Sequence, residues 1–147
     1  MALVGVITRL PTALDTQLQR DAGITHIEYS VLSWLSRRPE RTARMSEVAA
    51  LNSVTLSHLS RIATRLEQRG WLRRAPDPSD GRVTLATLTD AGWEKVVATA
   101  PGHVEEVQRR VFDRLQPAQV RQLLETDTAI LDGLCPGQHQ TLAPKAR

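Results

Sequence analysis

Arginines gather around a short turn in the middle of the chain. Arg73 and Arg74 precede the turn sequence PDPSDG, and Arg82 follows it directly. A guanidinium presents a planar fork of donors that matches phosphate oxygens and the edge of guanine. An arginine on a loop can also enter a narrow minor groove of DNA, where the potential is most negative. This chemistry favours a nucleic-acid partner.

Asp80 stands two residues before Arg82, in a turn that two prolines stiffen. An ion pair from Asp80 would hold the long Arg82 side chain extended and reduce the entropy lost on binding. We therefore predict that Arg82 inserts into the minor groove and that Asp80 positions it. Arg73 and Arg74 are expected to meet the DNA backbone or solvent. The alternative is an ordinary surface ion pair across a turn, worth less than ~1 kcal/mol.

Polar side chains also line one face of the segment upstream of this turn. Apolar residues between Leu59 and Leu66 recur at helical spacing, which leaves the opposite face of the predicted helix polar. Arg61 could fork onto guanine, and Arg65, one turn later, is expected to reach a phosphate. The predicted DNA-contacting residues of this helix are Thr55, Ser57, His58, Arg61 and Arg65. The alternative is an ordinary exposed helix face.

The basic charge is concentrated in the same region. The whole chain of 147 residues carries +3, but ten arginines and five acidic residues between Arg37 and Arg82 give that segment +5. Only two of the 19 basic residues are lysines. The alternative is a solvated face in an arginine-rich protein.

The elements before the polar helix are two predicted helices and a connection. Spaced apolar residues predict a helix over 3–18, with a bend at Pro11. Thr25 and Glu28 have the spacing of a capping box at the start of a second helix, which must end near Arg38 because a proline follows. The segment RPERTAR is predicted to be a polar connection.

The next elements predict a helix-turn-helix with a wing. MSEVAALNS is a short helix that Ser46 is expected to cap, and the polar helix follows after hardly any linker and stops at Gly70. WLRRA and RVTLATL are predicted strands on either side of the turn, with Val83 and Leu85 on the apolar side. A short helix, a tight connection, a second helix and a hairpin are the order of a winged helix-turn-helix.

Two further helices complete the chain. Thr89 is expected to cap the first of them, which Pro101 and Gly102 should kink or interrupt. Pro117 stands at the start of the second, and its apolar stripe continues to Leu134.

The winged segment resembles the MarR family of bacterial transcription regulators. The resemblance rests on a wing motif of Asp80, Arg82 and a strand ending in Leu-Thr-x-x-Gly, and on an Arg-Leu-Glu-x-x-Gly helix ending. In this sequence these positions are Asp80, Arg82, Leu88, Thr89 and Gly92 in the wing, and Arg65, Leu66, Glu67 and Gly70 in the helix.

The resemblance implies a mainly α fold with a small β-hairpin, in which a winged helix-turn-helix core is flanked by N- and C-terminal dimerisation helices. Residues 1–147 would be a single domain, with a DNA-binding part at about 26–92, dimerisation helices at 1–22 and 93–135, and a flexible tail at 136–147. It implies a homodimer that binds a pseudo-palindromic operator, usually as a repressor. A small phenolic or anionic ligand often releases such proteins from DNA.

Other residue types favour neither a cofactor nor a metal. Cys135 is the single cysteine, expected in a packing or surface role, and the four histidines are scattered in the sequence. Tyr29 and Trp34 could touch a ligand pocket, although core packing is the favoured interpretation. The composition indicates a globular protein without a signal peptide or membrane span, so the cytoplasm is the expected location.

The sequence also bears on three other classes of function. Catalysis is disfavoured, because adjacent Ser57 and His58 point about 100° apart on a helix and no phosphate loop or nucleophile elbow occurs. Single-stranded nucleic acid is disfavoured by an aromatic content of 3%. A winged-helix module for protein interaction, without specific DNA binding, remains the alternative to the DNA-binding regulator.

Overall fold

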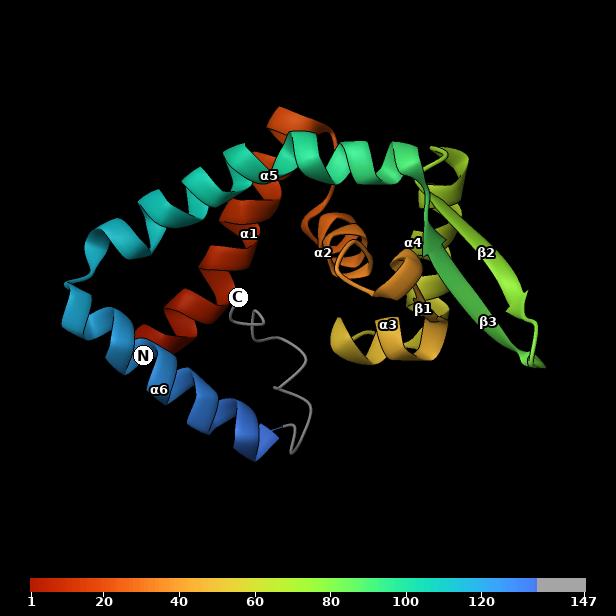
Figure 1. Cartoon of the computed structure of the whole chain (residues 1–147). Coiled ribbons are helices and arrows are strands. Elements are labelled where there is room, and N and C mark those ends of the chain that lie inside the picture. Colours follow the sequence, from red (N-terminus) through yellow and green to blue (C-terminus); the bar gives the residue numbers. More distant parts are fainter. Residues whose placement is uncertain (135–147) are drawn as a thin grey trace. The chain divides into compact units, whose positions relative to one another are not determined.

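The computed structural model describes residues 1–134 and contains two compact units, Met1–Glu106 and a second that begins at Val107 (Figure 1). The described helices are α1 (Ala2–Ala22), α2 (His26–Leu35), α3 (Met45–Leu51), α4 (Leu56–Gln68), α5 (Asp90–Arg110) and α6 (Pro117–Leu134), with 3-10 turns at Pro39–Arg41 and Phe112–Arg114. The strands are β1 (Thr42–Arg44), β2 (Leu72–Asp77) and β3 (Asp80–Leu88). The predicted fold class, mainly helical with a small β-wing, is confirmed.

The join between α1 and α2 follows the predicted local signals. Gly23 ends α1 in the left-handed conformation, with φ at 61°. At the start of α2 the Glu28 amide donates to Thr25 Oγ1 at 3.3 Å, and the Thr25 amide donates to the Glu28 carboxylate at 3.0 Å. This reciprocal pair is the predicted capping box, which satisfies two backbone donors that the helix leaves open.

The wing is a three-stranded antiparallel sheet in the order β1-β3-β2, not a two-stranded hairpin alone. The segment predicted as a polar connection contains β1, whose Ala43 pairs with Ala86 of β3. Thr42 and Thr87 also share a hydrogen bond between their hydroxyls at 2.9 Å. A strand of three residues is too short to show a period of two, and its partner lies more than 40 residues further along the chain. Sequence periodicity therefore missed it.

The start of α3 also differs from the prediction. The helix begins at Met45, directly after β1, and Arg44 occupies the capping position without a side-chain hydrogen bond. Ser46 therefore lies inside the first turn and does not cap the helix. Because β1 runs into α3 with no linker, the chain has no room for a separate capping residue.

The hydrophobic core of the first unit lies between its helices and the sheet. The predicted apolar face of α4 is buried, since Leu59, Ile62, Ala63 and Leu66 are each 0% exposed. On β3 the buried residues are Ala86 and Leu88, whereas Val83 and Leu85 are only half-buried. The predicted strand face was therefore wrong, because the β2–β3 hairpin extends beyond the helices of the first unit (Figure 1), and only the end of β3 nearest α5 reaches the core.

The helix α5 begins as predicted but continues further. Thr89 Oγ1 accepts a hydrogen bond from the Gly92 amide at 3.0 Å and so caps the helix. Pro101 lies inside α5, and the predicted interruption at Pro101–Gly102 does not occur. A proline removes one hydrogen bond of a helix, and the bonds on either side of it can hold the remaining turns together.

The second unit contains α6, which Pro117 starts as predicted and in which no side chain is buried. Among residues 1–134, no helix has the length and apolar character to cross a membrane. The predicted flexible tail and Cys135 lie outside the described residues.

Candidate nucleic-acid interface

The helix pair α3 and α4 forms the predicted helix-turn-helix. Thr55 caps α4, because its Oγ1 accepts a hydrogen bond from the His58 amide at 3.2 Å. The Thr55 hydroxyl oxygen thus caps the helix, and its O–H can still donate to a phosphate. Ser57, His58 and Arg61 are exposed on the polar face, as expected for side chains that would enter a groove.

Arg61 offers an unoccupied guanidinium on this face. It is exposed, and within residues 1–134 its side chain has no hydrogen bond or ion pair. It lines a shallow hollow together with Leu56, Ser57, Ser60 and Thr64. Its donors are therefore free for a base edge or a phosphate.

Arg65 is bound by Glu28, a residue that the sequence did not indicate as part of the site. Its Nε donates to Glu28 Oε1 at 2.9 Å, and the Glu28 side chain is only 3% exposed. Burial alone raises the pKa of the Glu28 carboxyl, but hydrogen bonds from Thr25 and Arg65 outweigh it and bring that pKa below its ordinary value. Arg69 Nη1 lies 4.0 Å from the other carboxylate oxygen and donates to the Gly23 carbonyl at 2.9 Å. Glu28 therefore joins the start of α2 to the end of α4.

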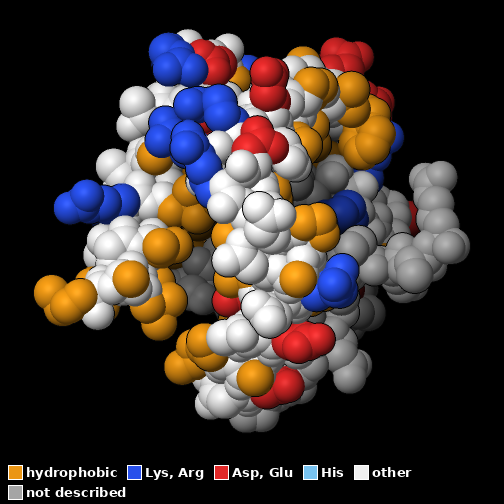
Figure 2. Space-filling view, turned by 90° about the vertical axis from the view of Figure 1, so that its left-hand side faces the viewer, with side chains coloured by type: hydrophobic (Ala, Val, Ile, Leu, Met, Phe, Trp, Pro, Cys, Tyr) orange, Lys and Arg blue, Asp and Glu red, His pale blue; other side chains and the backbone are white. Residues whose placement is uncertain are grey.

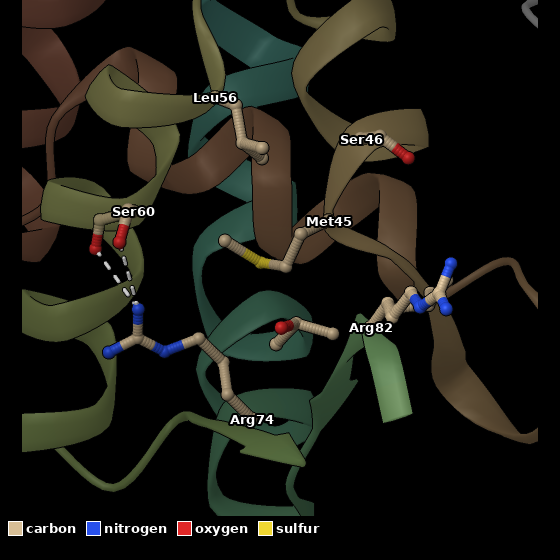
Figure 3. Close-up of a pocket in the computed structure, with 8 residues that line it drawn as sticks. Met45, Ser46, Leu56, Ser60, Arg74 and Arg82 are labelled. Carbon is tan, nitrogen blue, oxygen red and sulfur yellow. Dashed lines mark hydrogen bonds between the residues drawn. The ribbon is translucent and has the colours of Figure 1, made fainter. Parts of the chain in front are cut away.

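Arg74 was predicted to meet the DNA backbone or solvent, but in the structure its side chain binds residues of α4. It lies on β2, but its guanidinium is directed to α4 (Figure 3). Its Nη2 and Nε donate to Glu67 Oε2 at 2.6 and 2.9 Å, and its backbone amide donates to Glu67 Oε1 at 2.8 Å. It also donates to Ser60 Oγ at 3.1 Å and to Thr64 Oγ1 at 3.0 Å. The hydrogen bonds from Arg74 lower the pKa of the Glu67 carboxyl.

The wing tip differs from the predicted ion pair. Asp80 Oδ1 accepts a hydrogen bond from the backbone amide of Arg82 at 3.1 Å, and no ion pair joins their side chains in the described chain. The chain turns at Pro78 and Ser79, with Ser79 donating to the Asp77 carboxylate from both its amide and its hydroxyl. Arg82 is exposed, and its side chain extends away from Arg74 in Figure 3.

The ten arginines of the basic segment therefore divide into three groups, of which the first is Arg37 alone, whose Nε donates to the Ser33 carbonyl at 3.3 Å. Six of them bond to carboxylates or lie within 4.0 Å of one: Arg38, Arg41, Arg44, Arg65, Arg69 and Arg74. In contrast, the guanidinium groups of Arg61, Arg73 and Arg82 are exposed and, in the part of the chain that is described, have no such partner. Three arginines of the basic segment, one each on α4, β2 and β3, thus remain free to bind a negatively charged partner.

Tyr29 and Trp34 lie in the hydrophobic core, 8% and 5% exposed, in agreement with the packing interpretation. The structure also brings together residues that are far apart in the sequence. The His103 ring lies 4.9 Å from Tyr29 and 6.0 Å from His26, measured between ring centroids, and its Nδ1 is 3.4 Å from Gln17 Oε1. Burial lowers the pKa of both histidines.

Within residues 1–134, histidine, aspartate and glutamate side chains form no group of three or more suited to a metal ion. The roles expected for Cys135 and His139 lie beyond this range.

Comparison with known proteins agrees with the observed fold. A family model described as the MarR family matches residues 22–83. A MarR family transcriptional regulator from Streptomyces coelicolor, solved in complex with DNA, shares 44% sequence identity, with a TM-score of 0.88 over 93% of this chain and 86% of that one. The regulator PecS of Dickeya dadantii (strain 3937) is 30% identical over 71% of this chain and 66% of its own length.

A third relative is named as a repressor. IacR of Pseudomonas putida is 32% identical over 54% of this chain and 47% of its own length. The chain thus spans slightly less than two thirds of PecS and about half of IacR.

Proposed function

The chain belongs to the MarR family of transcriptional regulators, and from this membership we propose that it is a repressor that binds specific double-stranded DNA. The observation that carries the proposal is the pair of free guanidinium groups of Arg61 and Arg82, on the second helix of a helix-turn-helix and on its wing. In this arrangement the helix enters the major groove and the wing meets the adjoining minor groove. The S. coelicolor relative, solved with DNA, supports this partner.

We propose that the protein acts as a homodimer. The start of α1 exposes a row of apolar side chains, Leu3, Val4, Val6 and Ile7, each at least 56% exposed. Separately, α6 exposes Leu124 at 69% and Leu134 at 71%. Hydrophobic side chains are visible at the surface in the view of Figure 2. Apolar patches of this kind mark protein–protein contacts.

This assignment divides the chain into a DNA-binding part at about 26–92 and dimerisation helices at 1–22 and 93–135. Two such DNA-binding parts would occupy the half-sites of a pseudo-palindromic operator.

We further propose that a small phenolic or anionic ligand releases the protein from DNA. Two buried polar side chains support this idea: Gln17 on α1 is 3% exposed and Thr99 on α5 is 6% exposed. The Thr99 hydroxyl has no hydrogen-bond partner in the described chain. A buried hydroxyl without a partner is costly, and a ligand acceptor would satisfy it.

The central experiment is selection of bound sequences from a random duplex pool, followed by titration over a range of salt concentrations. We expect one enriched pseudo-palindrome, bound at least about 1,000-fold more tightly than random duplex at physiological salt. Equal affinity for all duplexes would contradict the proposal. No binding to any duplex would instead favour the protein-interaction module.

The dimer is tested by sedimentation of Ile7→Glu, which places a charge in the exposed apolar row of α1. We expect a monomer that keeps its helical content and loses preference for the two-half-site duplex. Ile7→Met is the matched control and should remain dimeric.

A further inference from the structure

The wing and the recognition helix are joined by one cluster of hydrogen bonds, the Arg74 bridge, made of Arg74, Glu67, Ser60 and Thr64. Glu67, Ser60 and Thr64 lie on one face of α4, because they are spaced three and four residues apart. The Arg74 guanidinium bonds to all three side chains at distances of 2.6 to 3.1 Å. A weaker contact of 3.4 Å runs to the Ser60 carbonyl.

The bridge occupies every nitrogen of the guanidinium. Nε and Nη2 bond to Glu67, Nη2 also bonds to Thr64, and Nη1 bonds to Ser60. The Arg74 side chain is 24% exposed and the Glu67 side chain 30%, so the pair is partly shielded from water. A guanidinium with all its nitrogens bonded has little capacity left for a phosphate.

The bridge also lies between the two free cations. Arg74 pairs with Ala86 of β3, the strand that carries Arg82, while Glu67 belongs to the helix that carries Arg61. A pocket between α3, α4 and the wing is lined by Arg74 and Arg82 together with Met45, Leu56 and Ser60 (Figure 3). In that view the Arg74 side chain crosses toward Ser60, while the Arg82 side chain points away from it.

We propose that Arg74 and Glu67 are positioning residues for DNA recognition: they hold the wing at a set distance from α4, so that Arg61 and Arg82 reach one half-site together. The inference rests on the proposed DNA-binding function. Glu67 would then favour specific binding by holding the wing in place. Its negative charge alone would have the opposite effect, because it repels the DNA phosphates.

These two opposite effects of Glu67 on DNA affinity allow the proposal to be tested. Removing the negative charge of Glu67 reduces repulsion of the DNA backbone, which by itself raises the affinity for any duplex. Loss of the bridge instead lets the wing move relative to α4. This lowers the affinity only for a specific duplex, to which α4 and the wing must bind at the same time. Glu67→Gln has nearly the same shape as the native residue, so packing is preserved.

The experiment compares the unaltered protein with the bridge variants Glu67→Gln and Arg74→Lys, and with Arg74→Gln, which removes the charge of Arg74. Each protein is titrated with the duplex enriched by the unaltered protein and with a scrambled duplex of the same composition, at several salt concentrations. Glu47→Gln is the matched control, because Glu47 lies on α3 and pairs with Arg38 rather than with the wing. Thermal unfolding by circular dichroism checks that each variant is folded.

We expect both bridge variants to lose roughly ten-fold or more in affinity for the enriched duplex, with no loss on the scrambled duplex and an unchanged salt slope. Glu47→Gln should not lose affinity for either duplex. Arg74→Lys is informative because lysine keeps the charge that a phosphate contact needs but lacks the fork that the bridge needs.

Two results would overturn the inference while leaving the proposed function intact. One is an unchanged or higher affinity of Glu67→Gln for the enriched duplex. The other concerns two variants of Arg74. If Arg74→Lys keeps its affinity, while Arg74→Gln loses affinity equally for both duplexes and its salt slope falls by about one, then Arg74 is a phosphate contact. If the unaltered protein prefers no duplex, the proposed function fails and the inference fails with it.

Discussion

The backbone amide of Arg82 donates to the Asp80 carboxylate at 3.1 Å, so Asp80 shapes the strand that carries Arg82. The exposed Arg82 guanidinium has no other bond in the described residues that a substitution would break. Folding and DNA contact are therefore separable at this position.

We expect Arg82→Ala to lower affinity for the enriched duplex by about ten-fold or more, because a minor-groove contact is lost. The free energy of unfolding should change by less than about 0.5 kcal/mol, as is usual at an exposed site. Arg73→Ala removes the same charge from the same hairpin and is the control, with a smaller loss on all sequences. Equal losses for the two variants in a fluorescence titration would contradict the wing assignment.

Arg61 is predicted to read a base. Arg61→Ala should cost about 1–3 kcal/mol of discrimination at one position of each half-site, because a bidentate contact to guanine would be lost. Selection from a random pool with the variant protein measures this directly. A uniform loss of affinity, with the base preference unchanged at every position, would make Arg61 a phosphate contact instead.

Glu28 is predicted to stabilise the fold through its charge. Glu28→Gln should lower the free energy of unfolding by about 2 kcal/mol at pH 7, because hydrogen bonds to a buried carboxylate are weakened. Since folding lowers the pKa of this carboxyl, its contribution is full above its ordinary value of 4.5 and is lost as pH falls through the lower folded value.

Urea unfolding at pH 7 and again below pH 4.5 measures this effect. The difference between Glu28→Gln and the unaltered protein should shrink in acid, whereas exposed Glu94→Gln should show little difference at either pH. A constant difference across pH would mean that the charge of Glu28 does not matter.

The histidine pair predicts a second pH dependence, at higher pH. Burial lowers the pKa of His103, and the neighbouring His26 lowers it further, so the folded protein favours the neutral ring. As pH falls below the ordinary value of 6.5, the unfolded chain binds more protons than the folded protein does. The free energy of unfolding therefore decreases as the pH is lowered. His103→Gln should flatten the stability curve between about pH 7 and pH 5. The exposed His58→Gln is the control and should leave that curve unchanged.

Gly92 is predicted to tolerate no side chain. A Cβ at this position would collide with the carbonyl oxygen of Trp71 and lie 2.7 Å from Leu88 Cδ1. Gly92→Ala should therefore destabilise the protein by about 1–3 kcal/mol in thermal unfolding. Gly102→Ala on the same helix meets only Gln17 Nε2, at 3.9 Å, and should be neutral or slightly stabilising. Similar effects of the two substitutions would contradict the steric explanation.

Signals that act over a few residues could be predicted from the sequence alone. The capping box at Thr25 and Glu28, the stop at Gly23 and the cap at Thr89 each depend on a residue and its close neighbours. The buried face of α4 follows from helical periodicity in the same way. These local signals, with the wing motif, were sufficient for the order of the helices and for the family.

The partner of each charged side chain depends on tertiary structure. Arg73 and Arg74 are neighbours with the same chemistry, yet one is exposed and the other bonds to Glu67, because adjacent residues of a strand point to opposite faces and only one face meets α4. Glu28 binds Arg65 across 37 residues for a similar reason. Charge and composition alone indicated a basic segment, whereas the packing of α4 against α2 and the wing decided which arginines remain free for DNA.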